Sequence, residues 1–448
     1  MDKGIIKTII GEKQREISQV NLVKRPVSYE DAMCYVNVGI RRAGKSWLLF
    51  QDIQERVVAG KTTFQDGLYI NFEDERISDI QSKELGLIID CYQEMFGPGK
   101  PLVYLDEIQN VNGWEKFVRR LAESGFRVMV TGSNARMLSK DIASTLGGSF
   151  VIREVFPFSW REYLSYHGVR PGPNWEYEPD TRLEVRRRFD DYFYNGGFAE
   201  SFPIVGKREW LTSLLQRILL GDILTRHKIR NDRQLRLLVR KVADNVMQPT
   251  SISRFEHVIK SSGEKISTPT VKDYLEYLEE SYLIYSIPNY ASPDSEQETL
   301  RKRYFIDNGL LNLYLYKGET KLLENIVALW LRKHYWNPEE PRLFYYKRGD
   351  VDLDFYIPEI KTAIQVSYDL SSQETRDREA GALVSFNRSF KLDQVLIVTF
   401  DQEETYEKDG LTIDVVPVWK WLLNFQSAPI QQPEEEGLRS QPGIADSQ

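Results

Sequence analysis

One segment near the N-terminus combines residue types and a spacing that bind phosphate. Residues Gly39 to Ser46 match the pattern G-x-x-x-x-G-K-[ST] at every fixed position. Gly39 and Gly44 permit backbone angles in which successive N–H groups point at phosphate oxygens. Lys45 is expected to reach the β- and γ-phosphates, and the Ser46 hydroxyl to bind Mg²⁺ at the positive end of the following helix. The segment therefore predicts a nucleotide phosphate site.

The flanking sequence favours this prediction over a chance match in a glycine-containing turn. A short apolar strand over 36–38 precedes the loop, and an amphipathic helix over 47–58 follows it. In this setting the loop N–H groups and the helix N-terminus face the same ligand. The residues expected to bind the nucleotide are Gly39, Ile40, Arg41, Arg42, Ala43, Gly44, Lys45, Ser46 and Trp47.

Two further apolar strands end in residues that suit phosphate chemistry. The first ends in Asp106 and Glu107. Asp106 is expected to orient the Mg²⁺ shell, and Glu107 to polarise the attacking water as general base. The second ends in Ser133 and Asn134, which would sense the γ-phosphate or the water. An ordinary turn is the alternative reading of this pair, but its place at the carboxyl edge of a parallel sheet favours the sensor role.

Strands and helices alternate with short links through residues 1–158. This pattern predicts a three-layer α/β domain with a mainly parallel sheet. Strands are expected at 36–38, 68–72, 101–105 and 127–131, and helices at 47–58 and 85–96.

These motifs, in this order, resemble the AAA-type ATPases of bacteria and archaea that carry a C-terminal domain of uncharacterised function. The matching segments are Gly39–Ser46, Tyr69–Asp74, Leu105–Gln109, Thr131–Asn134, Val155–Tyr163 and Asn195–Glu200. The resemblance continues into the C-terminal third. It implies a core that binds ATP and Mg²⁺, in proteins that share no single agreed cellular role.

One position departs from the family pattern. Relatives usually carry an arginine after the Gly-Gly pair that precedes the Phe-Pro segment, as an arginine finger for a neighbouring subunit, and Ser149 stands there in this chain. Arg136 and Arg153 are the alternatives. Because such a finger contributes about 10³ to 10⁵ in rate, we expect ATP binding with slow hydrolysis. Many relatives form rings, so the resemblance also implies a homo-oligomer.

The sequence predicts two helical units in the middle of the chain. Residues 159–243 are expected to form a helical lid over the nucleotide site, and residues 244–298 resemble a winged helix-turn-helix. In that segment Ser251 and Thr268 are expected to cap two helices, with Pro269 at the first position of the second.

The second of these helices is poorly suited to DNA. Its apolar stripe is Val271, Tyr274, Leu275 and Leu278, and its outward face is Lys272, Asp273, Glu276, Tyr277, Glu279 and Glu280. Four acids against one lysine repel phosphate. The sequence therefore favours a structural or protein-docking role over major-groove binding.

Residues 299–426 resemble the PD-(D/E)xK nuclease fold, in which a helical Glu, a strand Asp and an E-x-K motif hold Mg²⁺. Glu324 matches the first position and Asp354 the second, with Asp352 as the alternative. Gln365 takes the third position, and Ser367 stands where the lysine is expected. The site thereby loses a carboxylate that a hard cation prefers and a cation that would stabilise the cut phosphate. We expect impaired nuclease activity unless Lys361 or Arg376 replaces the lysine.

Composition limits the remaining classes. Two cysteines and four scattered histidines give no disulfide framework and no zinc-ligand spacing. No apolar run reaches the roughly 18 residues of a membrane helix, so a reducing, cytoplasmic setting without membrane contact is expected. The net charge of −7 does not favour nucleic acid. Residues 427–448 are rich in Pro, Gln and Glu and are expected to be disordered.

The leading hypothesis is an ATP-binding AAA-type ATPase that acts as a nucleotide-dependent switch. Its output would be contact with a protein partner or nucleic acid through the winged-helix and nuclease-like parts. One alternative is an ATP-regulated, Mg²⁺-dependent DNA nuclease in defence or DNA processing. The other is an adaptor that binds nucleotide without hydrolysing it.

Overall fold

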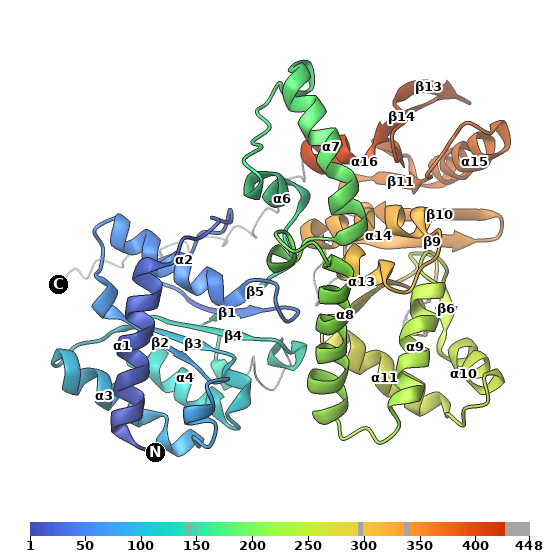
Figure 1. Ribbon diagram of the computed structural model, residues 1–448. Helices are drawn as coiled ribbons and strands as arrows, with labels where there is room; N and C mark the ends of the chain where they lie inside the picture. Colours follow the sequence, from blue (N-terminus) through green and yellow to red (C-terminus); the bar gives the residue numbers. More distant parts are fainter. Residues whose placement is uncertain (139–141, 143–144, 149, 294–298, 336–340, 426–448) are drawn as a thin grey trace, which may run out of the picture.

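A parallel five-stranded sheet organises the N-terminal part of the chain (Figure 1). The computed structural model describes the chain except residues 139–141, 143–144, 149, 294–298, 336–340 and 426–448 and the side chains of 136 and 138. The predictions for Ser149 and for the tail over 427–448 lie outside the described residues. The strands run in the order β2-β3-β4-β1-β5. They are β1 (Cys34–Val38), β2 (Gly67–Asn71), β3 (Leu102–Asp106), β4 (Val128–Gly132) and β5 (Phe150–Glu154).

Helices cover both faces of this sheet, as the alternating pattern predicts. One face carries Tyr69, Tyr104 and Met129 in register, and these pack against Leu49 and Ile53. The opposite face joins the main core, because successive strand side chains point to opposite sides. The helices are α1 (Lys3–Gln19), α2 (Lys45–Val58), α3 (Gly86–Phe96) and α4 (Trp114–Glu123). The predicted three-layer α/β arrangement is confirmed.

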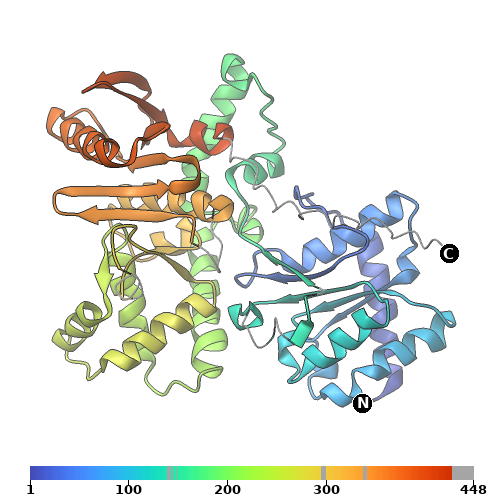
Figure 2. The ribbon, with the colours of Figure 1, turned by 180° about the vertical axis from the view of Figure 1, so that it is seen from behind.

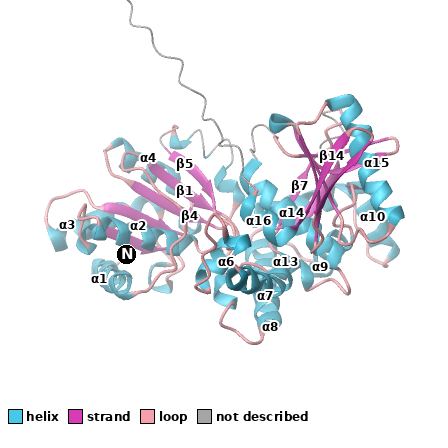
Figure 3. Cartoon of the chain, turned by 90° about the horizontal axis from the view of Figure 1, so that it is seen from above, coloured by secondary structure: helices cyan, strands magenta, loops and turns pink. Residues whose placement is uncertain are grey.

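A helical region follows the sheet and stands between the two large sheets of the molecule (Figure 3). Its α-helices are α6 (Trp160–Tyr166), α7 (Pro179–Asn195), α8 (Lys207–Arg217) and α9 (Asp232–Asp244). The helix α8 continues directly into a π-helix, η8 (Ile218–Thr225). Such stretches often occur at functional sites, because the wider turn redirects side chains.

The next unit is formed by two helices and a small antiparallel sheet (Figure 2). The helices are α10 (Ile252–Ser261) and α11 (Thr268–Glu280), and the strands are β6 (Thr250–Ser251), β7 (Ile284–Ile287) and β8 (Leu300–Phe305), in the order β6-β8-β7. Ser251 caps α10 as predicted. The predicted cap of α11 is wrong by one residue, because the Ser267 hydroxyl accepts the Thr270 N–H and Thr268 is already helical.

The strand β8 lies in the range 299–426 that was assigned from sequence to the nuclease-like fold, but it pairs with β7 and β6 and does not join the C-terminal sheet. That sheet is mixed, with the order β13-β14-β12-β11-β10-β9. Its strands are β9 (Phe344–Arg348), β10 (Val351–Ile357), β11 (Thr362–Val366), β12 (Gln394–Thr399), β13 (Glu404–Lys408) and β14 (Leu411–Pro417). The surrounding helices are α13 (Asn308–Asn312), α14 (Glu319–Tyr335), α15 (Gln373–Phe390) and α16 (Val418–Asn424).

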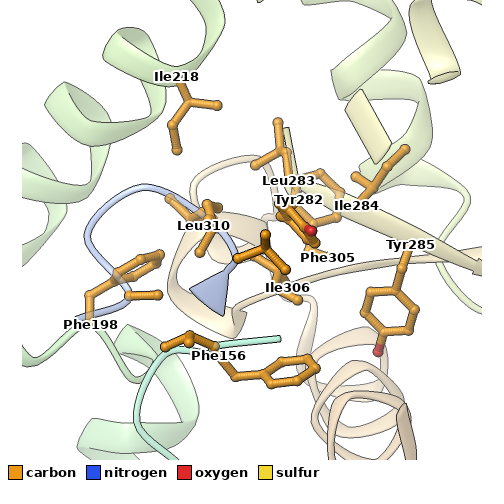
Figure 4. Close-up of a cluster of buried hydrophobic side chains, with 14 of the residues drawn as sticks. Phe156, Phe198, Ile218, Tyr282, Leu283, Ile284, Tyr285, Phe305, Ile306 and Leu310 are labelled. Carbon is orange, nitrogen blue, oxygen red and sulfur yellow. The ribbon is translucent and has the colours of Figure 1, made fainter. Parts of the chain in front are cut away.

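An apolar core joins the two halves of the molecule. Figure 4 shows side chains from the segment after β5, from η8 and from the small sheet in one cluster. Phe156, Ile218, Leu283 and Phe305 belong to it and are at most 7% exposed. This core holds the start of η8 beside the nucleotide-binding half. In the described ranges no helix is long and apolar enough to cross a membrane.

Candidate nucleotide site

The phosphate loop connects β1 to α2 in the conformation that its glycines permit. Gly39 has φ 149°, and a Cβ there would lie 2.2 Å from the Val155 carbonyl oxygen. Gly44 has φ 91° and precedes α2 as its N-terminal cap. Arg42 is also left-handed, with φ 67°, which is unusual for a residue with a side chain. The loop is therefore a strained segment that the surrounding structure holds in place.

Lys45 folds back over the loop. Its side chain is 3% exposed, and its Nζ donates to the carbonyl oxygens of Gly39 at 3.1 Å and Ile40 at 3.2 Å. The same atom lies 3.4 Å from the Glu107 carboxylate. The lysine is thus held by groups that an anionic phosphate would outcompete.

Asp106 lies at the carboxyl end of β3 and is completely buried. Its carboxylate accepts hydrogen bonds from the hydroxyls of Tyr69 at 2.6 Å, Thr131 and Ser46. Burial and the neighbouring Glu107 charge raise the pKa of Asp106. A carboxylate beside a serine hydroxyl offers the oxygen ligands that Mg²⁺ prefers, so the residues present fit this ion.

Glu107 has a left-handed backbone, with φ 52°, and its side chain is 10% exposed. The Gln109 amide donates to its Oε2 at 2.5 Å and to the Ser133 hydroxyl at 3.4 Å. Burial opposes the charge of Glu107, but Lys45 and Gln109 together hold the pKa of its carboxyl below the usual value. Ser133 and Asn134 are buried beside this group. The structure therefore brings the predicted base and sensor residues together, through a glutamine that the sequence reading missed.

A cavity of about 180 Å³ lies over these groups. Its walls come from the phosphate loop, the acidic pair, Asn71, Glu73, Glu200 and Arg217. The last two belong to the helical region after the sheet, so this region completes the cavity.

Two loop arginines connect the site to that helical region. Arg41 donates from Nε and Nη2 to the two carboxylate oxygens of Asp222, each at 3.0 Å, and from Nη1 to Glu73 at 2.7 Å. Arg42 donates to Glu200. Asp222 lies in η8 and is 5% exposed. Asp222, Arg217 and Glu200 were not expected from sequence as site residues. Asp222 and Arg217 lie in no matching segment, and Glu200 ends the matching segment Asn195–Glu200, to which no site role was assigned.

A second cavity of about 270 Å³ adjoins the first and shares Arg42, Gly44, Trp47 and Glu200 with it. Most of its remaining wall is apolar. Trp47 is 42% exposed beside it. The other apolar residues of the wall are Leu22, Val23, Ala43, Leu48, Phe158, Tyr166, Ala199 and Pro203. An apolar hollow next to a phosphate cavity can accept a flat base.

Of the two arginines proposed from sequence in place of Ser149, only Arg153 has a described side chain, and it lies away from this cavity. Arg153 donates to the Ser28 carbonyl oxygen at 2.8 Å, and its guanidinium lies 4.7 Å from the centre of the Tyr29 ring. It lines neither of the two cavities. The side chain of Arg136 lies outside the described residues. Arg217 is the arginine that the structure places at the cavity from beyond the loop.

The nuclease-like residues form a separate buried cluster. Glu324 and Asp354 face the same lysine, Lys302 of β8, whose Nζ lies 3.3 Å from Glu324 and 2.8 Å from Asp354. Tyr304 donates to Glu324 at 2.6 Å. Asp352, the alternative residue, is instead half exposed and pairs with Lys347 at 2.6 Å. The structure thus supplies a lysine that sequence spacing did not reveal.

Hydrogen bonds within the protein already occupy Gln365. Its Oε1 accepts the Asp354 N–H at 2.7 Å, and its Nε2 donates to Glu379 at 2.7 Å. Lys361 and Arg376 do not replace the missing lysine, because they pair with Asp393 and Glu404.

The charges of this cluster compensate one another. Burial and Asp354 raise the pKa of Glu324 to about 7. Burial opposes the charge of Lys302, but Asp354 and Glu324 raise its pKa. The described residues contain no group of three or more His, Cys, Asp or Glu side chains that could hold a metal ion.

Comparison with known proteins agrees with the site. A family model described as an AAA domain matches residues 32–164, and a domain of unknown function (DUF8612) matches residues 186–321. The uncharacterized protein MJ1544 of Methanocaldococcus jannaschii is 33% identical over 399 residues, covering 86% of this chain and 87% of its own. An uncharacterized protein of Haemophilus influenzae is 28% identical over 425 residues, covering 91% and 98%.

Among solved structures, the Walker-type ATPase PABY2304 of Pyrococcus abyssi is similar at 18% identity with a TM-score of 0.38, covering 70% of this chain and 95% of its own. That likeness is too weak to compare the two proteins residue by residue. The matched AAA domain contains the loop, the acidic pair and the sensor residues described above. The chain belongs to the family of MJ1544, and its N-terminal part is an AAA-domain P-loop ATPase.

Proposed function

We propose that the protein is a slow ATPase whose nucleotide state sets the contact between the phosphate loop and the helical region after the sheet. The observation that carries this proposal is the ion pair between Arg41, which lines the phosphate cavity, and Asp222 of the helical region. The base of ATP enters the apolar cavity beside Trp47, and the triphosphate enters the polar one. The shared wall of the two cavities supports this division of the ligand.

The residues that line the polar cavity have the following proposed roles. Ser46 and Asp106 would hold Mg²⁺, which would supply positive charge against the phosphates. The γ-phosphate attracts Lys45 away from Glu107. The pKa of Glu107 then rises, because its main cationic neighbour has left, and the carboxylate becomes a stronger base for the attacking water.

Arg217 supplies the cation that the family pattern places on a neighbouring subunit. It is exposed, it lines the phosphate cavity, and within the described ranges it forms no ion pair. Charge on the γ-phosphate would draw this side chain inward and stabilise the transition state. The proposed ATPase therefore completes its site within one chain.

We propose that the nucleotide state changes contacts made by the loop arginines and by α11. Phosphate competes with Asp222 and Glu200 for Arg41 and Arg42, which loosens the helical region. On the other side, α11 packs against the short helix η5 (Ala135–Leu138) that follows the sensor residues.

We further propose that α10, α11, β7 and β8 form a winged-helix-like unit used for docking within the protein. His227 stacks on Tyr277 of α11 with ring centroids 3.5 Å apart, so part of the outward face of α11 is covered. This contact and the acids on the same face support a docking role over DNA reading.

We propose that the C-terminal domain is a nuclease-like fold with a structural charge cluster. Lys302, completely buried between Glu324 and Asp354, takes the place that a divalent ion would need. This arrangement supports the reading of an impaired site and gives no support to the nuclease alternative.

Single-turnover hydrolysis of radiolabelled ATP tests the proposal against the adaptor alternative. Wild-type protein should hydrolyse ATP at least 100-fold faster than Glu107→Gln, while both variants bind a fluorescent ATP analogue. Lys45→Ala should lose binding, and Arg187→Ala, on an exposed face of α7, should behave as wild type. Equal rates for wild type and Glu107→Gln would establish the adaptor reading and overturn the ATPase proposal.

A further inference from the structure

The helix α9 has a buried apolar face and an exposed basic face. Leu235, Leu238 and Val242 are at most 1% exposed and pack into the core. Arg236 and Arg240, four residues apart, point to solvent on the same side of the helix. The basic side of α9 is therefore free to meet a partner.

The segment between α13 and α14 extends this basic side. Arg208 of α8 donates to the carbonyl oxygens of Asn312 and Leu313, at 3.4 and 3.1 Å. Lys321 of α14 donates to the carbonyl oxygen of Asp244, the last residue of α9, at 2.6 Å. Arg236 and Arg240 lie close enough to Tyr314 to act on its phenol electrostatically. Three elements far apart in sequence thus form one surface.

We call this surface the basic surface and define it by Arg208, Arg236, Arg240, Tyr316, Lys317 and Lys321. Lys241 adds a seventh side chain at its edge. The acids in the same segments are Glu209, Asp232, Asp244 and Glu319, so the six cations outnumber these four acids. Asp232 pairs with Arg236 at 3.1 Å. Arg240 and Lys317 have no carboxylate partner within the described part of the chain.

This surplus runs against the charge of the whole chain, which is −7. The excess of Lys and Arg on one face is the footprint expected of a phosphate-binding surface. The acidic outward face of α11 shows the opposite pattern. Attraction of phosphate to the basic surface falls with salt, because bound counterions are released on binding.

Tyr316 lies between Tyr314 and Lys317 in the chain, and 90% of its surface is exposed. A large aromatic ring in water contributes nothing to the core, but on a basic surface it offers a face on which an unpaired base can stack. A paired base inside a duplex cannot offer its face to this ring. The mixture of cations and one free ring favours a single strand over a duplex or an acidic peptide.

We propose that the basic surface binds single-stranded nucleic acid, with Arg236 and Arg240 on the phosphates and Tyr316 stacked on a base. The binding is separate from the ATP site and does not require hydrolysis.

Fluorescence anisotropy with a labelled single-stranded oligo-dT of about 20 nucleotides tests this inference on the full chain without ATP. Wild type should bind, and affinity should fall steeply with salt. The double variant Arg236→Glu, Arg240→Glu should lose at least 10-fold in affinity. Tyr316→Ala should lose about 5-fold or more, since stacking contributes about 1 to 3 kcal/mol per base, and Tyr316→Phe should keep most of it.

The matched control is Arg187→Glu, Arg388→Glu, which makes the same charge change at two positions whose side chains are 77% and 71% exposed elsewhere. It should bind as wild type. No binding by wild type, or equal losses in the control and the basic-surface variant, would overturn the proposal. Tighter binding of a duplex, or of polyglutamate, with no effect of Tyr316→Ala would replace it by a different partner.

Discussion

Arg41 and Asp222 are 181 positions apart in the chain and form a bidentate ion pair in which both hydrogen bonds are 3.0 Å long. The arginine belongs to the phosphate loop and the aspartate to the π-helix η8 of the helical region after the sheet. Burial opposes the charge of Arg41, but Asp222 and Glu73 raise its pKa, so it stays a cation within the site. The ATP site is therefore bonded to the region whose movement it is proposed to control.

Replacing Asp222 should tighten ATP binding. In Asp222→Asn the guanidinium of Arg41 no longer has a charged partner in η8 and is free to turn to phosphate. A charge-assisted hydrogen bond contributes about 1.5 to 3 kcal/mol, part of which is recovered, so we expect roughly 5- to 10-fold tighter binding. Titration with a fluorescent ATP analogue measures this.

Two variants complete that experiment. Arg41→Ala should weaken binding, and Asp232→Asn, an exposed acid of α9, should leave it unchanged. If Asp222→Asn weakens ATP binding as much as Arg41→Ala does, then Asp222 positions the arginine for phosphate and does not compete with it.

Arg217 should matter for turnover more than for affinity. Arg217→Ala is expected to lower the single-turnover rate by about 10²-fold or more, because an arginine on the transferring phosphoryl group contributes about 10³ to 10⁵ where it operates. The Kd for the ATP analogue should change less than 3-fold. The rate should not depend on protein concentration, since the cation comes from the same chain.

If a neighbouring subunit supplies the arginine finger, the opposite results are expected. A rate that rises with protein concentration, is insensitive to Arg217→Ala, and falls in Arg136→Ala or Arg153→Ala would place the finger on a second chain.

Sequence alone predicted those parts of the site whose chemistry is local. The phosphate loop and the pair Asp106 and Glu107 each lie within a few residues of a strand end, so their spacing was sufficient to predict that they line one cavity. Asp222 and Lys302 could not be found in this way, because each reaches its site only when distant segments pack. No sequence pattern marks one aspartate in an apolar helix or one lysine in a short strand.

The fold shows the same division. The helices α2 and α3 and the strands β1 to β4 of the first sheet were predicted within two residues of their observed bounds, whereas β5 was not expected. The pairing of β8 with β7 was missed, and so was the hairpin of β13 and β14, because strand partners depend on tertiary contacts that a strand's own residues do not specify. The N-terminal cap of α11 was predicted at Thr268 but is Ser267. Both residue types are good caps, so only the backbone angles decide between them.

Lys302 should be essential to the stability of the C-terminal cluster. Lys302→Met leaves Glu324 and Asp354 buried without their shared cation, which should cost about 3 to 5 kcal/mol in the free energy of unfolding. The double variant Lys302→Met, Glu324→Gln should recover part of this loss, because it removes one of the two repelling charges. Urea unfolding followed by tryptophan fluorescence measures both.

The matched control removes an exposed pair in the same domain. Lys347→Met breaks the ion pair with Asp352, whose side chains are 45% and 48% exposed, and should cost less than about 1 kcal/mol. A Lys302→Met variant as stable as Lys347→Met, with new Mg²⁺-dependent cleavage of DNA, would show that the lysine blocks a working metal site.

Asp307 should make stability depend on pH. Its carboxylate accepts the N–H groups of Gly197 at 2.7 Å and Leu310 at 3.2 Å, and a Cβ on Gly196 would lie 2.1 Å from it. This contact explains the Asn-Gly-Gly-Phe motif, whose glycines let the segment close around the acid. Burial raises the pKa of Asp307 to about 6, although the backbone N–H groups oppose the rise.

Because the folded pKa lies above the usual value of 3.8, the folded state holds this proton more tightly than the unfolded chain does. The protonated carboxyl of Asp307 therefore makes its whole contribution to the free energy of unfolding below about pH 4. This contribution, on the order of 3 kcal/mol, is lost as the pH rises through 6. In Asp307→Asn this dependence should disappear, whereas Asp393→Asn, at a side chain 69% exposed, should keep it. Urea midpoints between pH 4 and 7.5 decide the matter, and an unchanged slope in Asp307→Asn would assign the pH dependence to another buried acid, with Glu324 the first to test.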